Sequence, residues 1–162
     1  MAECPNESLI LAASPMMYVQ LYIQRVECVA LIDSGASDNF ISASLVRSLR
    51  LQVRNLPTPC HIRAANGGLM PCTHYVVVRA TLGELRFSLT LRVVPTDLRV
   101  ILGYPFLRFF DPAIWWRDRR MTIYKGDHEY QIPVETKLDA HSEPLMVPPV
   151  YQDPSPEDIS DT

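Results

Sequence analysis

Residues 30–40 read Ala-Leu-Ile-Asp-Ser-Gly-Ala-Ser-Asp-Asn-Phe, and this stretch decides the fold. An apolar run leads to one carboxylate at Asp33, and the hydroxyl of Ser34 and the small residues Gly35 and Ala36 follow. The pattern places Asp33 at the end of a buried strand, where an unpartnered carboxylate is costly. Asp-Ser-Gly by itself also fits an ordinary surface turn. The apolar run before it and the alanine after it favour a functional carboxylate.

The composition is that of a globular domain with terminal tails. The chain has 162 residues, of which 48% are apolar and 20% are charged. Its net charge of -3 gives no general reason to expect nucleic-acid binding. No apolar run reaches the roughly 20 residues that a membrane span needs. The N-terminus lacks the basic and apolar regions of a signal peptide. We therefore expect a domain that binds neither nucleic acid nor membrane.

The cysteines are widely spaced and form no Cys-x-x-Cys pair. Two disulfides are formally open, but without secretion signals we expect free thiols in a reducing compartment. Cysteine and histidine lie close together at residues 60–61 and 72–74, yet these spacings match no zinc site. We therefore predict no metal. The cysteines are Cys4, Cys28, Cys60 and Cys72.

Alternating hydrophobicity predicts a chain of strands. Residues 17–32 form a hairpin with Arg25 in its turn, and residues 39–41 form a short strand. Ser42 or Ser44 caps a brief helix that ends near Leu51. Residues 56–59 form a connector, and residues 60–70 an extended segment that turns at Asn66-Gly67, the strongest short hairpin signal. Further strands are predicted at 75–82, 85–94, 100–102, 113–116, 121–124 and 129–132, with a short helix at 104–110.

These elements predict an all-β domain over residues 17–132. An N-terminal arm precedes it at residues 1–16. From residue 133 to residue 162 the chain becomes proline-rich and acidic, which is typical of a disordered tail.

Three segments carry a resemblance to a known family, and together they span about residues 17–124. They are the Asp-Ser-Gly-Ala motif, the Asn66-Gly67-Gly68 hairpin tip, and the later run Ile-Leu-Gly-Tyr-Pro-Phe-Leu (101–107) followed by Asp-Pro-Ala-Ile-Trp-Trp (111–116). Their order resembles that of retropepsins, the retroviral-type aspartic proteases. The last run is similar to the end of proteases from gypsy-type LTR retrotransposons and host genes derived from them. The resemblance implies the retropepsin-like acid protease fold, closed and mostly antiparallel β with one or two short helices, as a homodimer.

The implied activity is an aspartic endopeptidase that cleaves extended segments of a retroelement-type polyprotein, including its own flanks. Amide hydrolysis requires a base that activates water and an acid for the leaving nitrogen. Two carboxylates about 3 Å apart share one proton and supply both roles. Asp33 lies in the only such motif, so two chains must meet at a two-fold axis to build the pair. No metal or organic cofactor is needed.

The resemblance also assigns site residues. Ser34 would hydrogen-bond across the two-fold axis, and the carbonyl of Gly35 would accept from the substrate backbone. Residues 64–69 would form a flap over the peptide, and Ile101 would pack beneath the active loop. The predicted catalytic residues are Asp33, Ser34 and Gly35, and the predicted substrate-binding residues are Ala36, Asp38, Ala64, Ala65, Asn66, Gly67, Gly68 and Ile101. For Asp38 a solvated side chain without a substrate contact is the open alternative.

One departure from the retroviral pattern concerns an ion pair. Retroviral proteases place an acidic residue two after the glycine and an arginine after the later apolar-Gly motif, whereas this chain has Ser37 and Tyr104. The sequence therefore leaves open how the dimer is braced.

Two other functions stay open. One is a domesticated binding or assembly module with weak or no catalysis, against which the intact residues 33–36 argue. The other is the retropepsin domain of ubiquitin-shuttle proteins, which is less favoured because this chain shows no ubiquitin-like segment. We expect the cytoplasm, or the inside of a retroelement particle, as the location.

Overall fold

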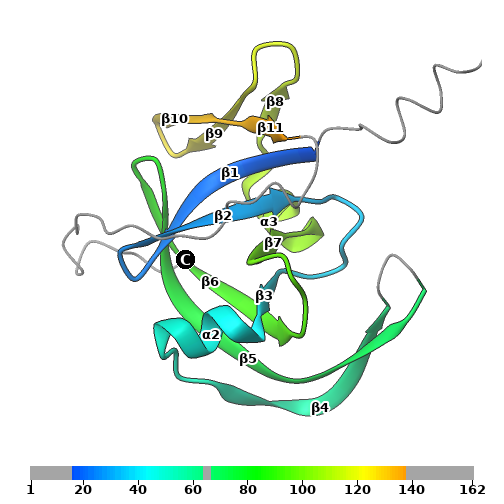
Figure 1. Ribbon diagram of the computed structural model, residues 1–162. Coiled ribbons are helices and arrows are strands. Elements are labelled where there is room, and N and C mark those ends of the chain that lie inside the picture. Colours follow the sequence, from blue (N-terminus) through cyan, green and yellow to red (C-terminus); the bar gives the residue numbers. More distant parts are fainter. Residues whose placement is uncertain (1–15, 64–66, 138–162) are drawn as a thin grey trace, which may run out of the picture.

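The computed structural model describes residues 16–63 and 67–137, and this part of the chain is mostly β, as predicted (Figure 1). Two short helices, α2 (Ala43–Leu49) and α3 (Tyr104–Phe110), accompany the strands of the described residues. The strands are β1 (Met16–Ile23), β2 (Val26–Ile32), β3 (Phe40–Ser42), β4 (Arg54–Arg63), β5 (Leu69–Leu82), β6 (Leu85–Val94), β7 (Val100–Leu102), β8 (Ala113–Trp115), β9 (Arg120–Lys125), β10 (His128–Pro133) and β11 (Glu135–Lys137).

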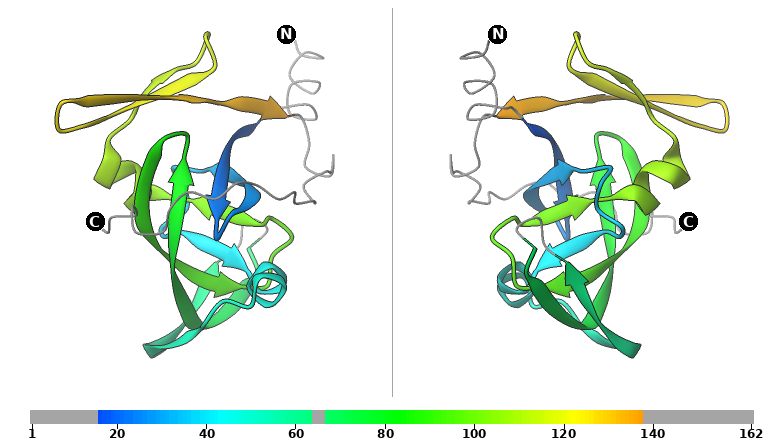
Figure 2. Two further views of the ribbon diagram at one scale, coloured as in Figure 1. Left: turned by 90° about the vertical axis from the view of Figure 1, so that its left-hand side faces the viewer. Right: turned by 90° about the vertical axis from the view of Figure 1, so that its right-hand side faces the viewer.

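The main sheet has eight strands in the order β11-β1-β2-β7-β3-β6-β5-β4. An additional antiparallel pairing of β1 with β5 curls this sheet toward closure. Two neighbouring pairs, β2 with β7 and β3 with β6, are parallel, while the other pairs are antiparallel. A second sheet, β10-β9-β8, projects at one end of the molecule (Figure 2).

Short turns join the strands where the sequence predicts them. Gln24 and Arg25 connect β1 to β2 with φ values of 51° and 70°. Positive φ at both central residues matches the right-handed twist of the flanking strands. The side chains of β6 alternate between the core and the surface, and its buried set is Leu85, Phe87, Leu89 and Leu91.

The core lies between the curled main sheet, α3 and the second sheet. The ring of Phe87 packs 5.1 Å from that of Phe110 and 6.0 Å from that of Phe106, both on α3. Met121, Ile123 and Ile132 belong to the same buried cluster. The second sheet is therefore held against the main sheet by the burial of apolar surface, which stabilises by about 25 cal/mol per Å².

The structure differs from the sequence-based expectations at three places. Residues 56–59 belong to β4 instead of forming a connector, and the pairing register with β5 shifts between Asn55 and Cys60. This strand lies at the sheet edge, where prolines such as Pro57 and Pro59 are tolerated. The next strand, β5, begins at Leu69, well before the expected residue 75. Residues 135–137, placed in the expected tail, pair with β1 as strand β11.

Among the residues that the structure describes, we find no helix with the length and apolar character needed to cross a bilayer. The expected N-terminal arm lies almost wholly outside the described residues, as does the tail after residue 137.

Candidate active site

The loop of residues 33–39, which we call the Asp33 loop, leaves the end of β2 and crosses the end of β7 to reach β3. It must do so because β7 lies between these two strands in the sheet. The backbone N–H of Asp33 donates to the carbonyl of Leu102, the last residue of β7, at 3.0 Å. The position of Asp33 is therefore set by the parallel pairing of β2 with β7.

Asp33 also organises the turn that follows it. One carboxylate oxygen, Oδ1, accepts the N–H of Gly35 at 2.9 Å, and the Asp33 carbonyl accepts the N–H of Ala36 at 3.0 Å. Asp33 is half-buried, whereas Ser34 and Gly35 are exposed. The turn thus presents a carboxylate at the surface, beside a hydroxyl and a backbone free of a side chain.

Gly103 holds the Asp33 loop from below. Its N–H donates to Oδ1 of Asn39 at 2.8 Å, and the N–H of Tyr104 donates to the carbonyl of Ala36 at 2.9 Å. A Cβ at position 103 would lie 2.7 Å from the Ala36 oxygen and closer still to the carbonyl oxygen of Asp38. Only glycine permits this approach, which explains the Gly103 of the Ile-Leu-Gly run.

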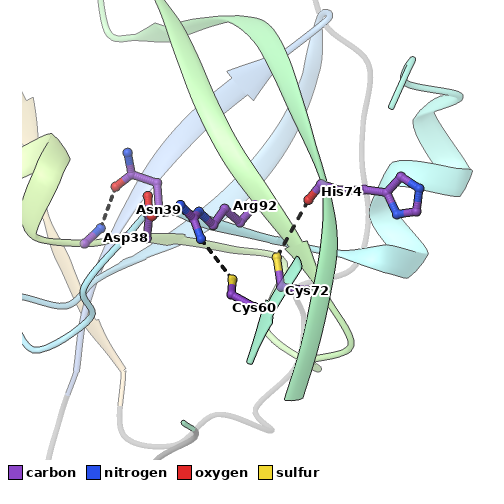
Figure 3. Close-up of polar contacts among 7 residues, drawn as sticks. Asp38, Asn39, Cys60, Cys72, His74 and Arg92 are labelled. Carbon is purple, nitrogen blue, oxygen red and sulfur yellow. Dashed lines mark hydrogen bonds and ion pairs between the residues drawn. The ribbon is translucent and has the colours of Figure 1, made fainter. Parts of the chain in front are cut away.

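Asp38 is bound within its own chain. Its Oδ2 forms an ion pair with Nε of Arg92 at 2.8 Å, and its Oδ1 accepts the N–H of Asn39 at 2.9 Å. Both side chains of the ion pair are about one-third exposed, at 31% and 33%. The Arg92 guanidinium also donates from Nη1 to Sγ of Cys60 at 3.1 Å (Figure 3). A structural ion pair thus occupies the carboxylate that we expected to contact substrate, and the substrate role stays a prediction.

Arg92 is a site residue that sequence reasoning missed. Residues 85–94 alternate between apolar and polar side chains, and this pattern by itself predicts only that Arg92 faces solvent. The parallel pairing of β3 with β6 places Phe40 opposite Arg92 and brings the guanidinium to the Asp33 loop. This chain has Ser37 and Tyr104 where retroviral proteases have an ion pair. An ion pair is nevertheless present nearby, between Asp38, the next residue of the loop, and Arg92 on β6.

The predicted flap residues that the structure describes, residues 67–69, lie at the far end of the β4–β5 hairpin. In Figure 1 this end of the hairpin and the Asp33 loop lie on the same side of the molecule. Gly67 is exposed with a φ of 92°, and Gly68 is exposed beside it. Arg63 pairs with Leu69 across the strands and donates from Nη1 to the carbonyl of Gly67 at 3.4 Å. Ala64, Ala65 and Asn66 lie outside the described residues.

A second apolar cluster joins the Asp33 loop to the β4–β5 hairpin. Ile101, predicted to pack beneath the loop, is half-buried in this cluster and pairs with Leu31 and Phe40. No single stretch of sequence indicates this cluster, because its members come from the Asp33 loop and from the five strands β3 to β7. They are Phe40, Cys72 and Val94, with the partly buried Ala36, Leu56, Cys60, Ile62, Met70 and Ile101.

Within residues 16–63 and 67–137, no three His, Cys, Asp or Glu side chains gather as a metal site would require. Cys28, Cys60 and Cys72 are free thiols in this structure.

Comparisons with known proteins bear on the fold and the family. A family model described as the PEG10/RTL1 protease domain matches residues 29–145, which include the Asp33 loop and Gly103. The retroviral protease-like domain of Ddi1 from Leishmania major is 19% identical, has a TM-score of 0.57 and is matched over 74% of this chain and 94% of that chain. A retropepsin-like aspartic protease from Rickettsia conorii is 16% identical, with a TM-score of 0.46, over 75% of this chain and 85% of that chain. The Leishmania domain confirms the predicted retropepsin-like fold.

Proposed function

Because the chain belongs to the PEG10/RTL1 protease domain family, we propose that it is an aspartic endopeptidase in which two chains each contribute Asp33. The predicted kinship with retropepsins of gypsy-derived genes is part of that premise and is confirmed by the family match. The observation that carries the proposal is the placement of Asp33 itself. A half-buried carboxylate stands on a turn that two strands anchor through their backbones, beside exposed Ser34 and Gly35.

The chemistry requires two such carboxylates. With one proton shared between them, the ionised Asp33 takes a proton from water while the protonated Asp33 of the other chain polarises the scissile carbonyl. Water attacks the carbonyl carbon while the protonated Asp33 gives its proton to the carbonyl oxygen. The proton taken from water then passes to the nitrogen as the C–N bond breaks, and a hydroxyl of the intermediate returns one proton to the carboxylate pair. Each chain supplies one loop of this kind, so the active enzyme is a homodimer. In it, the Ser34 hydroxyl of each chain holds the loop of the other.

The substrate is an extended peptide segment of a polyprotein. Strand β4 is an edge of the main sheet, and extended peptides bind by adding strand-like hydrogen bonds to such backbones. Gly67 and Gly68 at the hairpin end and the carbonyl of Gly35 then contact the substrate backbone from opposite sides. Ala36 and Ile101, at the second apolar cluster, form part of the wall for substrate side chains.

The catalytic unit comprises the predicted domain of residues 17–132 together with β11, which adds a strand to the main sheet. The enzyme acts in the cytoplasm or in a retroelement particle, and neither nucleic acid nor membrane contributes to its site.

The test is cleavage of a peptide library and of longer polyprotein segments by the purified chain. Asp33→Asn should abolish cleavage, because an amide cannot carry the shared proton. Asp127→Asn is the matched control, since Asp127 is exposed in the turn between β9 and β10, which lies on the opposite side of the molecule from the Asp33 loop (Figure 1). A pepstatin-like transition-state mimic should block the wild-type chain.

Dimerisation is tested separately. Sedimentation should show a monomer–dimer equilibrium, and excess Asp33→Asn chain should inhibit the wild type, because mixed dimers hold one competent loop. An active monomer would refute the shared site. Failure of the wild type to cleave any peptide under dimer-forming conditions would favour a domesticated binding module with the same fold.

A further inference from the structure

Cys60 on β4 and Cys72 on β5 lie directly opposite each other in the antiparallel ladder. Residues opposite each other in such a ladder have side chains on the same face and Cα atoms about 4.5–5.5 Å apart. Cα–Cα distances of this size fall inside the range of about 4.4–6.8 Å that disulfides require. The two thiols are thus placed for a disulfide without movement of the strands.

The two thiols also share one environment. Cys72 is 1% exposed in the second apolar cluster, and Cys60 packs against that cluster at the protein surface. Burial raises the pKa of the Cys72 thiol, with further contributions from the charge of Cys60 and a hydrogen bond between the two thiols. Direct contact between a partly exposed cysteine and a buried one is the arrangement of an attacking thiol with its resolving partner.

Arg92 links this pair to the Asp33 loop (Figure 3). Its guanidinium contacts Sγ of Cys60 through Nη1 and the Asp38 carboxylate through Nε. Asp38 accepts the N–H of Asn39, whose own Oδ1 accepts the N–H of Gly103. A continuous series of polar contacts therefore runs from the cysteine pair to the backbone that supports Asp33.

We propose that Cys60 and Cys72 form a reversible disulfide that lowers the peptidase activity. The regulatory part rests on the function proposed above, whereas the disulfide itself does not. The oxidant is a peroxide and the reductant a small thiol such as glutathione. A cytosolic disulfide of this kind is typically transient and redox-sensing.

The oxidation proceeds in two steps. Cys60 Sγ attacks one peroxide oxygen, the O–O bond breaks, and Cys60 becomes a sulfenic acid as one water leaves. Cys72 Sγ then attacks Cys60 Sγ, the S–O bond breaks, and the oxygen leaves as a second water with the remaining thiol proton. Cys60 reacts first because it is partly exposed and because the Arg92 guanidinium attracts the negative charge on a reacting sulfur.

The disulfide affects the site through Arg92. Bonding Cys60 Sγ to Cys72 removes the thiol that accepts from Nη1 and turns the sulfur toward the second apolar cluster. Arg92 then loses one of the two side-chain partners that hold it against Asp38. The Asp33 loop is held less firmly, and the turnover rate falls.

Mass spectrometry tests the disulfide independently of activity. Trypsin cleaves after Arg54, Arg63 and Arg79, so it releases Cys60 on peptide 55–63 and Cys72 on peptide 64–79. Treatment with hydrogen peroxide should join these two peptides, and dithiothreitol should separate them. The test uses the wild-type chain and a Cys4→Ser/Cys28→Ala variant that keeps only the pair. Absence of the joined peptides from the oxidised wild type overturns the proposal.

Cleavage assays test the regulation. Peroxide should lower the cleavage rate of the wild type and of Cys4→Ser/Cys28→Ala several-fold, and dithiothreitol should restore it. Cys60→Ser, whose hydroxyl still accepts from Arg92, should be insensitive to peroxide. Peroxide inhibition that persists in Cys60→Ser overturns the regulatory role. A reduced wild type that cleaves nothing overturns the proposed function and the regulation with it, while the joined peptides still decide the disulfide.

Discussion

Replacing Gly103 by alanine should displace the Asp33 loop because the added Cβ would clash with it. The backbone dihedrals of Gly103 would not be strained by alanine. Gly103 has a φ of -101° and a ψ of -159°, extended values that alanine adopts readily. The added Cβ, however, would meet the Ala36 carbonyl oxygen at 2.7 Å and the Ala36 Cβ at 3.0 Å, with the Asp38 oxygen nearer still. These obstacles are mainly backbone atoms, so no side-chain rotation can relieve them.

The cost follows from that geometry. Overpacking a well-packed site costs about 1–3 kcal/mol. The upper end applies here, because the Ala36 carbonyl is held by the N–H of Tyr104 and must move away from it. At a urea m-value of about 2 kcal/mol/M, a loss of about 3 kcal/mol lowers the unfolding midpoint by about 1.5 M. Peptidase activity should be lost even in the folded fraction, because the moving backbone carries Asp33.

Gly126→Ala is the matched control. Gly126 has a φ of 62° and no atom within 4 Å of an added Cβ, so alanine there meets left-handed strain alone. That strain costs about 1 kcal/mol and leaves the Asp33 loop untouched. The measurement is urea unfolding followed by circular dichroism, with cleavage assays beside it. Equal losses in the two variants, or full activity in Gly103→Ala, would refute the close packing of Gly103 under the loop.

Three further predictions concern stability. Asp38→Asn and Arg92→Gln, combined in a double-mutant cycle, should show a coupling of at most about 1 kcal/mol that shrinks in high salt, since the pair is partly exposed; no coupling at low salt would refute the ion pair. Ser42→Ala should cost about 1 kcal/mol in urea unfolding because Ser42 Oγ accepts the N–H of Leu45 at 3.1 Å, whereas Ser48→Ala on the exposed face of α2 should cost nothing. Burial raises the pKa of Cys28 from 9.0 to about 12. Below pH 9.0 the thiol is neutral in both states and its contribution to the free energy of unfolding is complete. Between pH 9.0 and about 12 the thiol ionises in the unfolded chain alone, so the free energy of unfolding falls by up to about 4 kcal/mol. Cys28→Ala should flatten that decline in alkaline unfolding curves, and an unchanged slope would contradict the assignment.

The strands were largely predictable because each depends on local pattern. Alternation along residues 85–94 placed β6 correctly, and the predicted turn at Arg25 placed the first hairpin, although the structure includes Gln24 in that turn as well. Errors arose where pairing overrode local signals. The prolines of residues 56–59 suggested a connector, yet an edge strand tolerates them, and the three residues of β11 become a strand only because β1 is available to pair with them.

The candidate site divides in the same way. Asp33, Ser34 and Gly35 follow one another along the chain, so the apolar run before them and the small residues around them were enough to propose them as site residues from sequence. The sequence could not predict that Arg92 belongs to the site. The parallel pairing of β3 with β6 is what brings Arg92 to its partner Asp38. Without that pairing, an arginine on an alternating strand indicates only a solvent-facing position.

The sequence by itself determined that a carboxylate would end a buried strand and that a later apolar run, Ile101-Leu102, would end in Gly103. It also predicts that one chain holds half of a two-carboxylate site. Such features are encoded by neighbours in the chain. Only the tertiary structure decided that Gly103 supports Asn39, that Asp38 pairs with Arg92, and that Cys60 faces Cys72. These contacts depend on strand order and register, which arise from the burial of a whole sheet and which no short stretch of residues specifies.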